Sequence, residues 1–136
     1  MFEWNESFAT GIKEIDSQHQ RLFEIGQEID VLLGTYLDES TLDHALELIN
    51  ELKDYTEYHF NTEKKLFIKY NYPDMGAHLV QHEKFIEYLK SIHPDEVKEN
   101  QEEFLHDLLN KIAQWIFKHI NNSDFKYVPF LKNMMK

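Results

Sequence analysis

Residues 56–82 read TEYHFNTEKKLFIKYNYPDMGAHLVQH. They predict the end of one helix, a turn at 71–74 and the start of a second helix, because Pro73 disfavours a helical conformation in the residue before it. On both sides of the turn, polar residues recur four positions apart, as His59 with Glu63 and as His78 with His82. Residues spaced by four project from one face of a helix, about a turn apart. The segment therefore predicts two antiparallel helices, each with a pair of potential metal ligands on one face.

Four long helices are predicted for the whole chain. Their approximate bounds are 16–33, 40–70, 75–92 and 100–120, separated by Gly34, by the turn at 71–74 and by His93-Pro94. Glycine just past a helix end and proline after it are typical stops. The short connections make successive helices antiparallel neighbours. We therefore expect an all-α, up-down-up-down four-helix bundle with an N-terminal arm (1–15) and a short C-terminal helical tail, in one domain spanning 1–136.

The composition narrows the classes of function. The chain has 136 residues, 42% of them hydrophobic and 14% aromatic, which is enough for a substantial core. A net charge of −11 argues against nucleic acid and anionic membranes as partners. The chain contains no cysteine, so disulfides, thiolate metal sites and cysteine catalysis are excluded. Neither a signal peptide nor a run of about 18 apolar residues is visible, which predicts a soluble cytoplasmic protein.

Each predicted helix has an inward line of residues spaced by three and four, and six polar side chains fall on these otherwise apolar lines. They are His19, His59, Glu63, His78, His82 and His119. The other histidines, His44, His93 and His106, fall off the lines. In an up-down-up-down bundle the six residues come to the same end. An unpartnered buried polar group costs roughly 1–3 kcal/mol, and a domain is stable by only about 5–15 kcal/mol. A metal is a common partner that removes this cost.

Asp124 is a further candidate, although it lies five residues after His119. On a continuous α-helix that spacing turns the two side chains roughly 140° apart, at about 100° per residue. We expect the helix to end at Asn121-Asn122-Ser123, so that the departing chain brings Asp124 back toward the others.

Each of these residues, taken alone, has a simpler explanation than a metal site. A lone histidine such as His19 is more often a satisfied core residue, and one four-spaced pair can be accidental. All six residues on four converging lines favour a metal site. Five imidazoles and two carboxylates exceed the needs of one ion and suit two ions that share bridging carboxylates. Iron fits this mixed donor set best, and manganese and zinc remain compatible with the residue types.

These motifs resemble the hemerythrin family, in particular its single-domain bacterial members, the bacteriohemerythrins. The matching pieces, in the family's order and over nearly the whole chain, are Trp4-Asn5-Glu6-Ser7-Phe8, Ile15-Asp16-Ser17-Gln18-His19, His59-x3-Glu63, His78-x3-His82 and His119-x4-Asp124-Phe125-Lys126-Tyr127.

The resemblance implies a role for each position. One iron ion would be held by His78, His82 and His119, and the other by His19 and His59. Glu63 and Asp124 would bridge the two ions, together with an oxo or hydroxo group from solvent, which leaves one position free for dioxygen. The family's pocket around that position corresponds to six residues that plain core packing would also explain: Leu22, Phe85, Trp115, Ile116, Ile120 and Tyr127. Metal-bound imidazoles need orienting partners. Asp16, Gln18 and Tyr127 are candidates, and Asp16 could equally cap a helix.

The function that the resemblance implies is reversible dioxygen binding for storage, transport or delivery to an oxygen-requiring enzyme, without catalysis by the chain itself. A di-iron oxidoreductase acting on peroxide or nitric oxide is the main alternative, and an oxygen or iron sensor is another. Oxygen-activating di-iron bundles typically use glutamate-rich ligand sets, so five histidines favour the carrier. A sensor would need an attached output domain.

Overall fold

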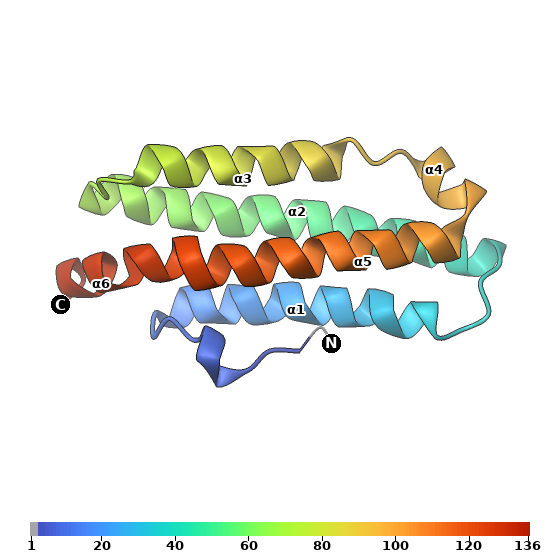
Figure 1. Ribbon diagram of the computed structural model, residues 1–136, viewed down its shortest axis with the longest axis horizontal. Helices are drawn as coiled ribbons and strands as arrows, with labels where there is room; N and C mark the ends of the chain where they lie inside the picture. Colours follow the sequence, from blue (N-terminus) through green and yellow to red (C-terminus); the bar gives the residue numbers. More distant parts are fainter. Residues whose placement is uncertain (1–2) are drawn as a thin grey trace.

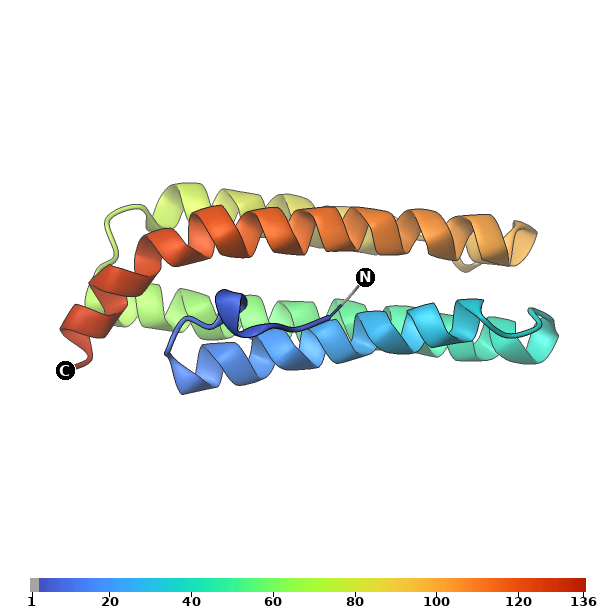
Figure 2. The same ribbon diagram turned by 60° about the horizontal axis from the view of Figure 1, so that its bottom comes forward.

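Four long helices make up the body of the protein (Figure 1). The computed structural model describes residues 3–136. The four helices are α1 (Lys13–Leu33), α2 (Glu39–Tyr70), α3 (Met75–Lys90) and α5 (Gln101–Lys118). They run alternately in opposite directions, and both views show them side by side (Figures 1 and 2). The predicted all-α, up-down-up-down bundle is confirmed, and residues 3–136 contain no strand.

Four shorter elements complete the described part of the chain: η1 (Glu6–Phe8), α4 (Pro94–Glu99), η2 (His119–Asp124) and α6 (Phe125–Met134). The helix α4 was not predicted; Pro94 stands at its first position, where a missing N–H costs nothing. The helix α6 is the predicted C-terminal tail. The predicted end of the fourth long helix at Asn121-Asn122-Ser123 is wrong, because η2 is a π-helical turn that continues α5 into α6.

The two ends of α2 are fixed by side chains and by one unusual backbone conformation. Asp38 accepts hydrogen bonds from the amides of Ser40 and Thr41, and the Thr41 hydroxyl accepts one from the Asp38 amide. Such a reciprocal capping box typically stabilises a helix start by about 1 kcal/mol. At the other end Asn71 takes a φ of 55°, a left-handed conformation that ends helices. The turn toward α3 thus begins just after the helix segment that carries His59 and Glu63.

The core follows the predicted lines closely, with a shift near two helix ends. Leu32 and Phe67 are buried, whereas Leu33 and Leu66, which steps of three and four residues from His19 and His59 reach, are only half-buried. A strict alternation of three and four residues drifts slowly around a helix of 3.6 residues per turn, which explains such one-residue shifts. Most buried apolar residues form one cluster between the four long helices. A second, smaller cluster lies around Ile15, Phe67 and Tyr127. No helix within residues 3–136 combines the length and the apolar character needed to cross a membrane.

The N-terminal arm is held against α1 and α5. The Phe8 ring stacks on Phe117 of α5, with centroids 5.4 Å apart, and Trp4 packs edge-on against Phe23 of α1. The Asp16 carboxylate accepts hydrogen bonds from the Thr10 amide at 2.7 Å, the Thr10 hydroxyl at 2.8 Å and the Gly11 amide at 3.0 Å. Asp16 therefore fastens the arm to the first turn of α1.

We expect Asp16→Ala to lower the free energy of unfolding by about 1–3 kcal/mol, because the amides of Thr10 and Gly11 and the Thr10 hydroxyl lose a charged acceptor. Urea unfolding followed by circular dichroism measures the change. Glu14→Ala, an exposed carboxylate in the same turn, is the matched control. Equal stability of the two variants would contradict this role of Asp16.

Candidate metal centre

The seven predicted ligand side chains meet at one end of the bundle, where η2 leads into α6. The helix α6 is labelled in Figure 1. They come from α1, α2, α3 and η2, and none is more than 5% exposed. They are His19, His59, Glu63, His78, His82, His119 and Asp124. The other three histidines, His44, His93 and His106, are all exposed. The lines of helical spacing thus separate buried from exposed histidines correctly.

The buried side chains form two donor groups that share a carboxylate. The first consists of Glu63, His78, His82, His119 and Asp124, and the second of His19, His59 and Glu63. Within each group, one donor atom per residue lies within 4.8 Å of all the others. One group therefore has three imidazoles and the other has two.

Asp124 lies between the two groups. Its Oδ1 atom is 3.0 Å from His119 Nε2 and 3.2 Å from His78 Nε2, both in the first group. Its Oδ2 atom is 3.2 Å from His19 Nε2, in the second group. Each carboxylate oxygen thus faces a different group, which is the arrangement needed to join two cations.

Glu63 also faces both groups, but through one oxygen. Its Oε1 atom is 3.1 Å from His82 Nε2 and 3.5 Å from His59 Nε2. Its Oε2 atom accepts a hydrogen bond from the Tyr127 hydroxyl. Tyr127 is therefore a partner of the carboxylate, and this bond fixes the orientation of Glu63.

The π-helical turn η2 brings Asp124 to the site. A π-helix bonds residue i to residue i+5, so its turn is one residue wider than that of an α-helix. Residues five apart, such as His119 and Asp124, then lie on the same face, with their donor atoms 3.0 Å apart. The placement of Asp124 beside the histidines was predicted, but the cause is a widened turn and not the end of a helix. Turns of this kind are frequent at functional sites.

Two glutamines set which nitrogen of a ring carries the proton. The Gln18 amide nitrogen donates to the Thr62 hydroxyl at 3.1 Å, so its Oε1 atom is the one that lies 2.7 Å from His59 Nδ1. A carbonyl oxygen only accepts hydrogen bonds, so His59 Nδ1 carries the proton and its Nε2 lone pair points into the site. His59 thereby has the form that a metal requires.

Gln81 does the same for His119. Its Oε1 atom lies 2.9 Å from His119 Nδ1 and accepts a second hydrogen bond from the Ser123 hydroxyl at 2.6 Å. Among the three orienting candidates from the sequence, Gln18 contacts an imidazole, Tyr127 contacts Glu63, and Asp16 holds the arm. Gln81 was missed. It lies one residue before His82 on an exposed part of α3, and no helical spacing marks it.

The buried polar atoms of the site are not satisfied by the protein alone. Glu63 Oε1 and both carboxylate oxygens of Asp124 are buried without a hydrogen-bond partner. The Nε2 atom of His119 lies 3.1 Å from that of His82 and 3.2 Å from that of His78. Because His119 donates through Nδ1, its Nε2 presents a lone pair to these rings. Converging lone pairs and buried anions need cations, so the donor set fits metal ions.

The electrostatics agree with this conclusion. Burial lowers the pKa of His59 to about 4, so this ring is neutral at pH 7. Burial opposes a charge on His78, but the adjacent carboxylates, first that of Asp124 and then that of Glu63, outweigh that effect and raise its pKa to about 9. Burial would also raise the pKa of Asp124, yet the neighbouring imidazoles, first that of His119, hold it well below its usual range. Two ionised carboxylates thus lie in the core, where metal ions can replace the protons that balance them.

Aromatic rings pack directly against two of the imidazoles. Phe60 is parallel to His82 with centroids 3.7 Å apart, and Trp115 stacks on His119 at 4.3 Å. Phe85 stacks in turn on Trp115 at 4.1 Å. Phe60 was not singled out from the sequence, because a phenylalanine on a helix next to His59 is ordinary core by its pattern. These rings thus cover one face of His82 and one face of His119.

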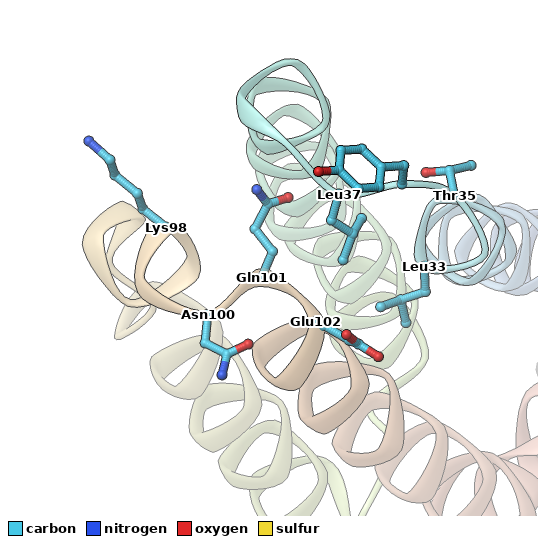
Figure 3. Close-up of a pocket in the computed structure, with 8 residues that line it drawn as sticks. Leu33, Thr35, Leu37, Lys98, Asn100, Gln101 and Glu102 are labelled. Atoms are coloured by element: carbon cyan, nitrogen blue, oxygen red, sulfur yellow. The ribbon is translucent and has the colours of Figure 1, made fainter.

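The six residues matched to the family's pocket divide between two places. Leu22, Phe85, Ile116 and Ile120 are buried in the main core cluster, and the half-buried Trp115 packs against it. Tyr127 belongs to the smaller cluster. A separate hollow of about 430 Å³ lies at the opposite end of the bundle, between the α1–α2 loop and the start of α5 (Figure 3). Its lining contains no histidine and a single carboxylate, Glu102, so it offers no comparable donor set.

We expect Gln81→Leu to weaken iron binding by about 10- to 100-fold, because His119 loses the acceptor that orients its ring. Competition with a chelator of known affinity measures the change. Gln20→Leu, next to His19 but exposed, is the matched control and should bind iron as the unmodified protein does. Equal affinities for the two variants would show that Gln81 does not orient the ring.

Comparisons with known proteins agree with this site. The family described as Hemerythrin HHE cation binding domain matches residues 10–131. The chain is 31% identical over 128 residues to a bacteriohemerythrin from Clostridium acetobutylicum, across 94% of this chain and 99% of that one. It is 30% identical over 129 residues to a hemerythrin-like protein from Naegleria gruberi, across 93% of this chain and 90% of that one.

A solved structure shares the fold. It is a crystal structure of a leucine-to-phenylalanine mutant that superimposes with a TM-score of 0.75 and covers 95% of both chains. At 22% identity, this likeness supports the helical bundle alone. The family match, in contrast, spans nearly all of the sequence and includes every one of the seven buried donors. The chain therefore belongs to the hemerythrin family.

Proposed function

We propose that this single-domain chain binds dioxygen reversibly at a centre of two iron ions. His78, His82 and His119 would hold one ion, and His19 and His59 the other. Glu63 and Asp124 would be shared by the two ions, together with an oxo or hydroxo bridge from solvent. When bound, ferrous iron supplies the electrons that dioxygen needs to bind reversibly. The unequal number of imidazoles in the two donor groups carries this proposal.

The different number of imidazoles in the two groups would determine which ion has a free coordination position. Three imidazoles and three shared ligands would complete six positions around one ion. Two imidazoles and the same three shared ligands would give five. The ion held by His19 and His59 would thus be the one with room for an exogenous ligand. Open coordination positions are what separate reactive metal sites from closed ones.

The protein's own groups suit reversible binding better than chemistry on a substrate. Imidazoles outnumber carboxylates by five to two in the donor set, and carboxylate-rich sets are the ones typical of oxygen-activating bundles. Tyr127 keeps its proton, since burial, followed by the charge of Glu63, raises its pKa well above the usual value. Its hydroxyl can therefore keep its hydrogen bond to Glu63 at neutral pH and hold that carboxylate in place. The apolar side chains of Leu22, Ile116 and Ile120 lie in the neighbouring core and exclude water.

Anaerobic loading with ferrous iron, followed by exposure to air, tests the proposal. We expect an absorption band in the visible region that appears in air and disappears when oxygen is removed, without net oxygen consumption. Steady oxygen uptake in the presence of a reductant would indicate the di-iron oxidoreductase instead. Retention of zinc alone, with no iron taken up, would contradict both. The storage, transport or delivery role and the recipient enzyme stay predictions that depend on this result.

A further inference from the structure

A basic, aromatic hollow lies on the face formed by α3 and α5. Its volume is about 450 Å³. No carboxylate lines it, and its lining residues are Lys84, Phe85, Tyr88, Lys111, Gln114, Trp115 and Lys118. We call these residues the α3/α5 face. Phe85, Tyr88 and Trp115 provide an aromatic floor, and the three lysines stand around it.

The charge of this face is opposite to that of the protein. The chain has 14 basic residues against 25 acidic ones, and three of the 14 line this one hollow. Lys84, Lys111 and Lys118 are exposed and, among the described residues, belong to no ion pair. Lys111 lies over the Tyr88 ring, 5.2 Å from its centroid. Burial, followed by the charges of Asp107 and Glu96, raises the pKa of the Tyr88 hydroxyl at this face.

The same face adjoins the metal centre. A second hollow of about 380 Å³ shares Trp115 and Lys118 with the first and reaches His119 and Gln81. The half-buried Trp115 ring stacks on the His119 imidazole at 4.3 Å, with an angle of 13° between the planes. One aromatic ring therefore separates the lysine-rimmed surface from a donor of the first group.

We propose that the α3/α5 face docks an acidic one-electron carrier protein that reduces the centre. The inference depends on the proposed di-iron function. In each encounter the reduced carrier would give one electron to one ferric ion of the centre, which would become ferrous. Two encounters would return both ions to the ferrous state, the state proposed above to bind dioxygen.

Charge complementarity selects this partner. A protein of net charge −11 repels an acidic carrier over most of its surface, so a local cluster of three unpaired lysines defines where such a carrier can approach. Opposite charges around a contact steer encounter and fix orientation more than they add affinity. Here they would orient the carrier toward Trp115 and hence toward His119. A weak, transient complex is what repeated electron delivery requires.

The test uses an acidic [2Fe–2S] ferredoxin as the probe. Binding of the oxidised ferredoxin to the zinc-loaded protein is measured by NMR titration at low ionic strength, so that no turnover is involved. We expect saturable binding, with shifts at Trp115 and around Lys118, that weakens at least about tenfold in K84E/K111E/K118E. K84R/K111R/K118R should bind as the unmodified protein does.

The matched control is K13E/K65E/K69E. These three lysines are exposed on α1 and α2, and both triple variants change the net charge from −11 to −17, by −2 at each position. The two variants therefore repel the ferredoxin equally at long range and differ only in the face altered. Equal weakening by both, absence of saturable binding, or self-association through the α3/α5 face would each overturn the proposal.

Failure of this inference can be told apart from failure of the proposed function. If the protein takes up iron and oxygenates reversibly but does not bind ferredoxin, the docking proposal alone is wrong. If the protein takes up no iron, the proposed function fails, while the zinc-loaded titration still reports on the face. A stopped-flow measurement on the ferric protein should show reduction by ferredoxin slowed about tenfold or more in K84E/K111E/K118E.

Discussion

Asp124→Ala should reduce the iron content from about two ions per chain to below about one. The substitution removes both oxygens that face the two donor groups, so His19 on one side and His78 and His119 on the other lose their shared anion. The remaining carboxylate, Glu63, cannot balance two dications in the core. Iron is measured by mass spectrometry after anaerobic loading and desalting.

Two controls separate this effect from general damage to the fold. His44→Ala and His106→Ala remove exposed histidines and should keep the full iron content. Circular dichroism of Asp124→Ala should still show a helical bundle, because the side chain contributes no hydrogen bond to the backbone of the long helices. Two tightly held ions in Asp124→Ala would show that Asp124 does not bridge.

Removing the metal should lower the melting temperature by about 15–30 °C. An ion present at a thousand times its dissociation constant stabilises the folded state by about 4 kcal/mol, so two ions contribute roughly twice that. For a chain of this size each kcal/mol changes the melting temperature by a few degrees. The metal-free protein also retains buried carboxylate oxygens without partners. Thermal unfolding before and after dialysis against a chelator, under anaerobic conditions, measures the change.

Adding the metal back provides the control for this change in melting temperature. Adding ferrous iron back should restore the original melting temperature, whereas magnesium, which prefers an all-oxygen shell, should not. Identical melting temperatures with and without metal would mean that the seven donors are stable unaided. That result would remove the energetic reason for a metal in the core.

Much of the architecture was predictable because buried polar residues are rare. His78 and His82, spaced by four on an otherwise apolar helical line, define both a helix and the face that it buries. The same spacing placed His59 and Glu63 together and left His44 and His106 outside. The positions of these residues depend only on helical periodicity, which can be seen directly in the spacing of residues along the sequence.

The rest depended on features that periodicity does not encode. Asp124 was placed correctly for the wrong reason, since a π-helical turn leaves no mark in residue spacing other than the mismatch itself. Gln81 contacts His119 across two helices, and such a contact depends on how α3 and η2 pack. Phe60, on the adjacent helix α2, packs against the His82 ring, and this contact likewise depends on how two helices pack. The capping role of Asp38, which precedes the predicted helix start at 40, also depends on an extended backbone just before the helix.

The widened turn at His119–Asp124 also fixes the rotational phase of everything that follows it. One residue corresponds to about 100° of rotation around an α-helix. If the segment kept its present length but relaxed to ordinary α-helical spacing, the whole of α6 would be carried around its axis by that angle. Tyr127 would then turn away from Glu63, with which it is now hydrogen-bonded. The widened turn and the length of this short segment are therefore constrained together, more than the identity of the amino acids within it.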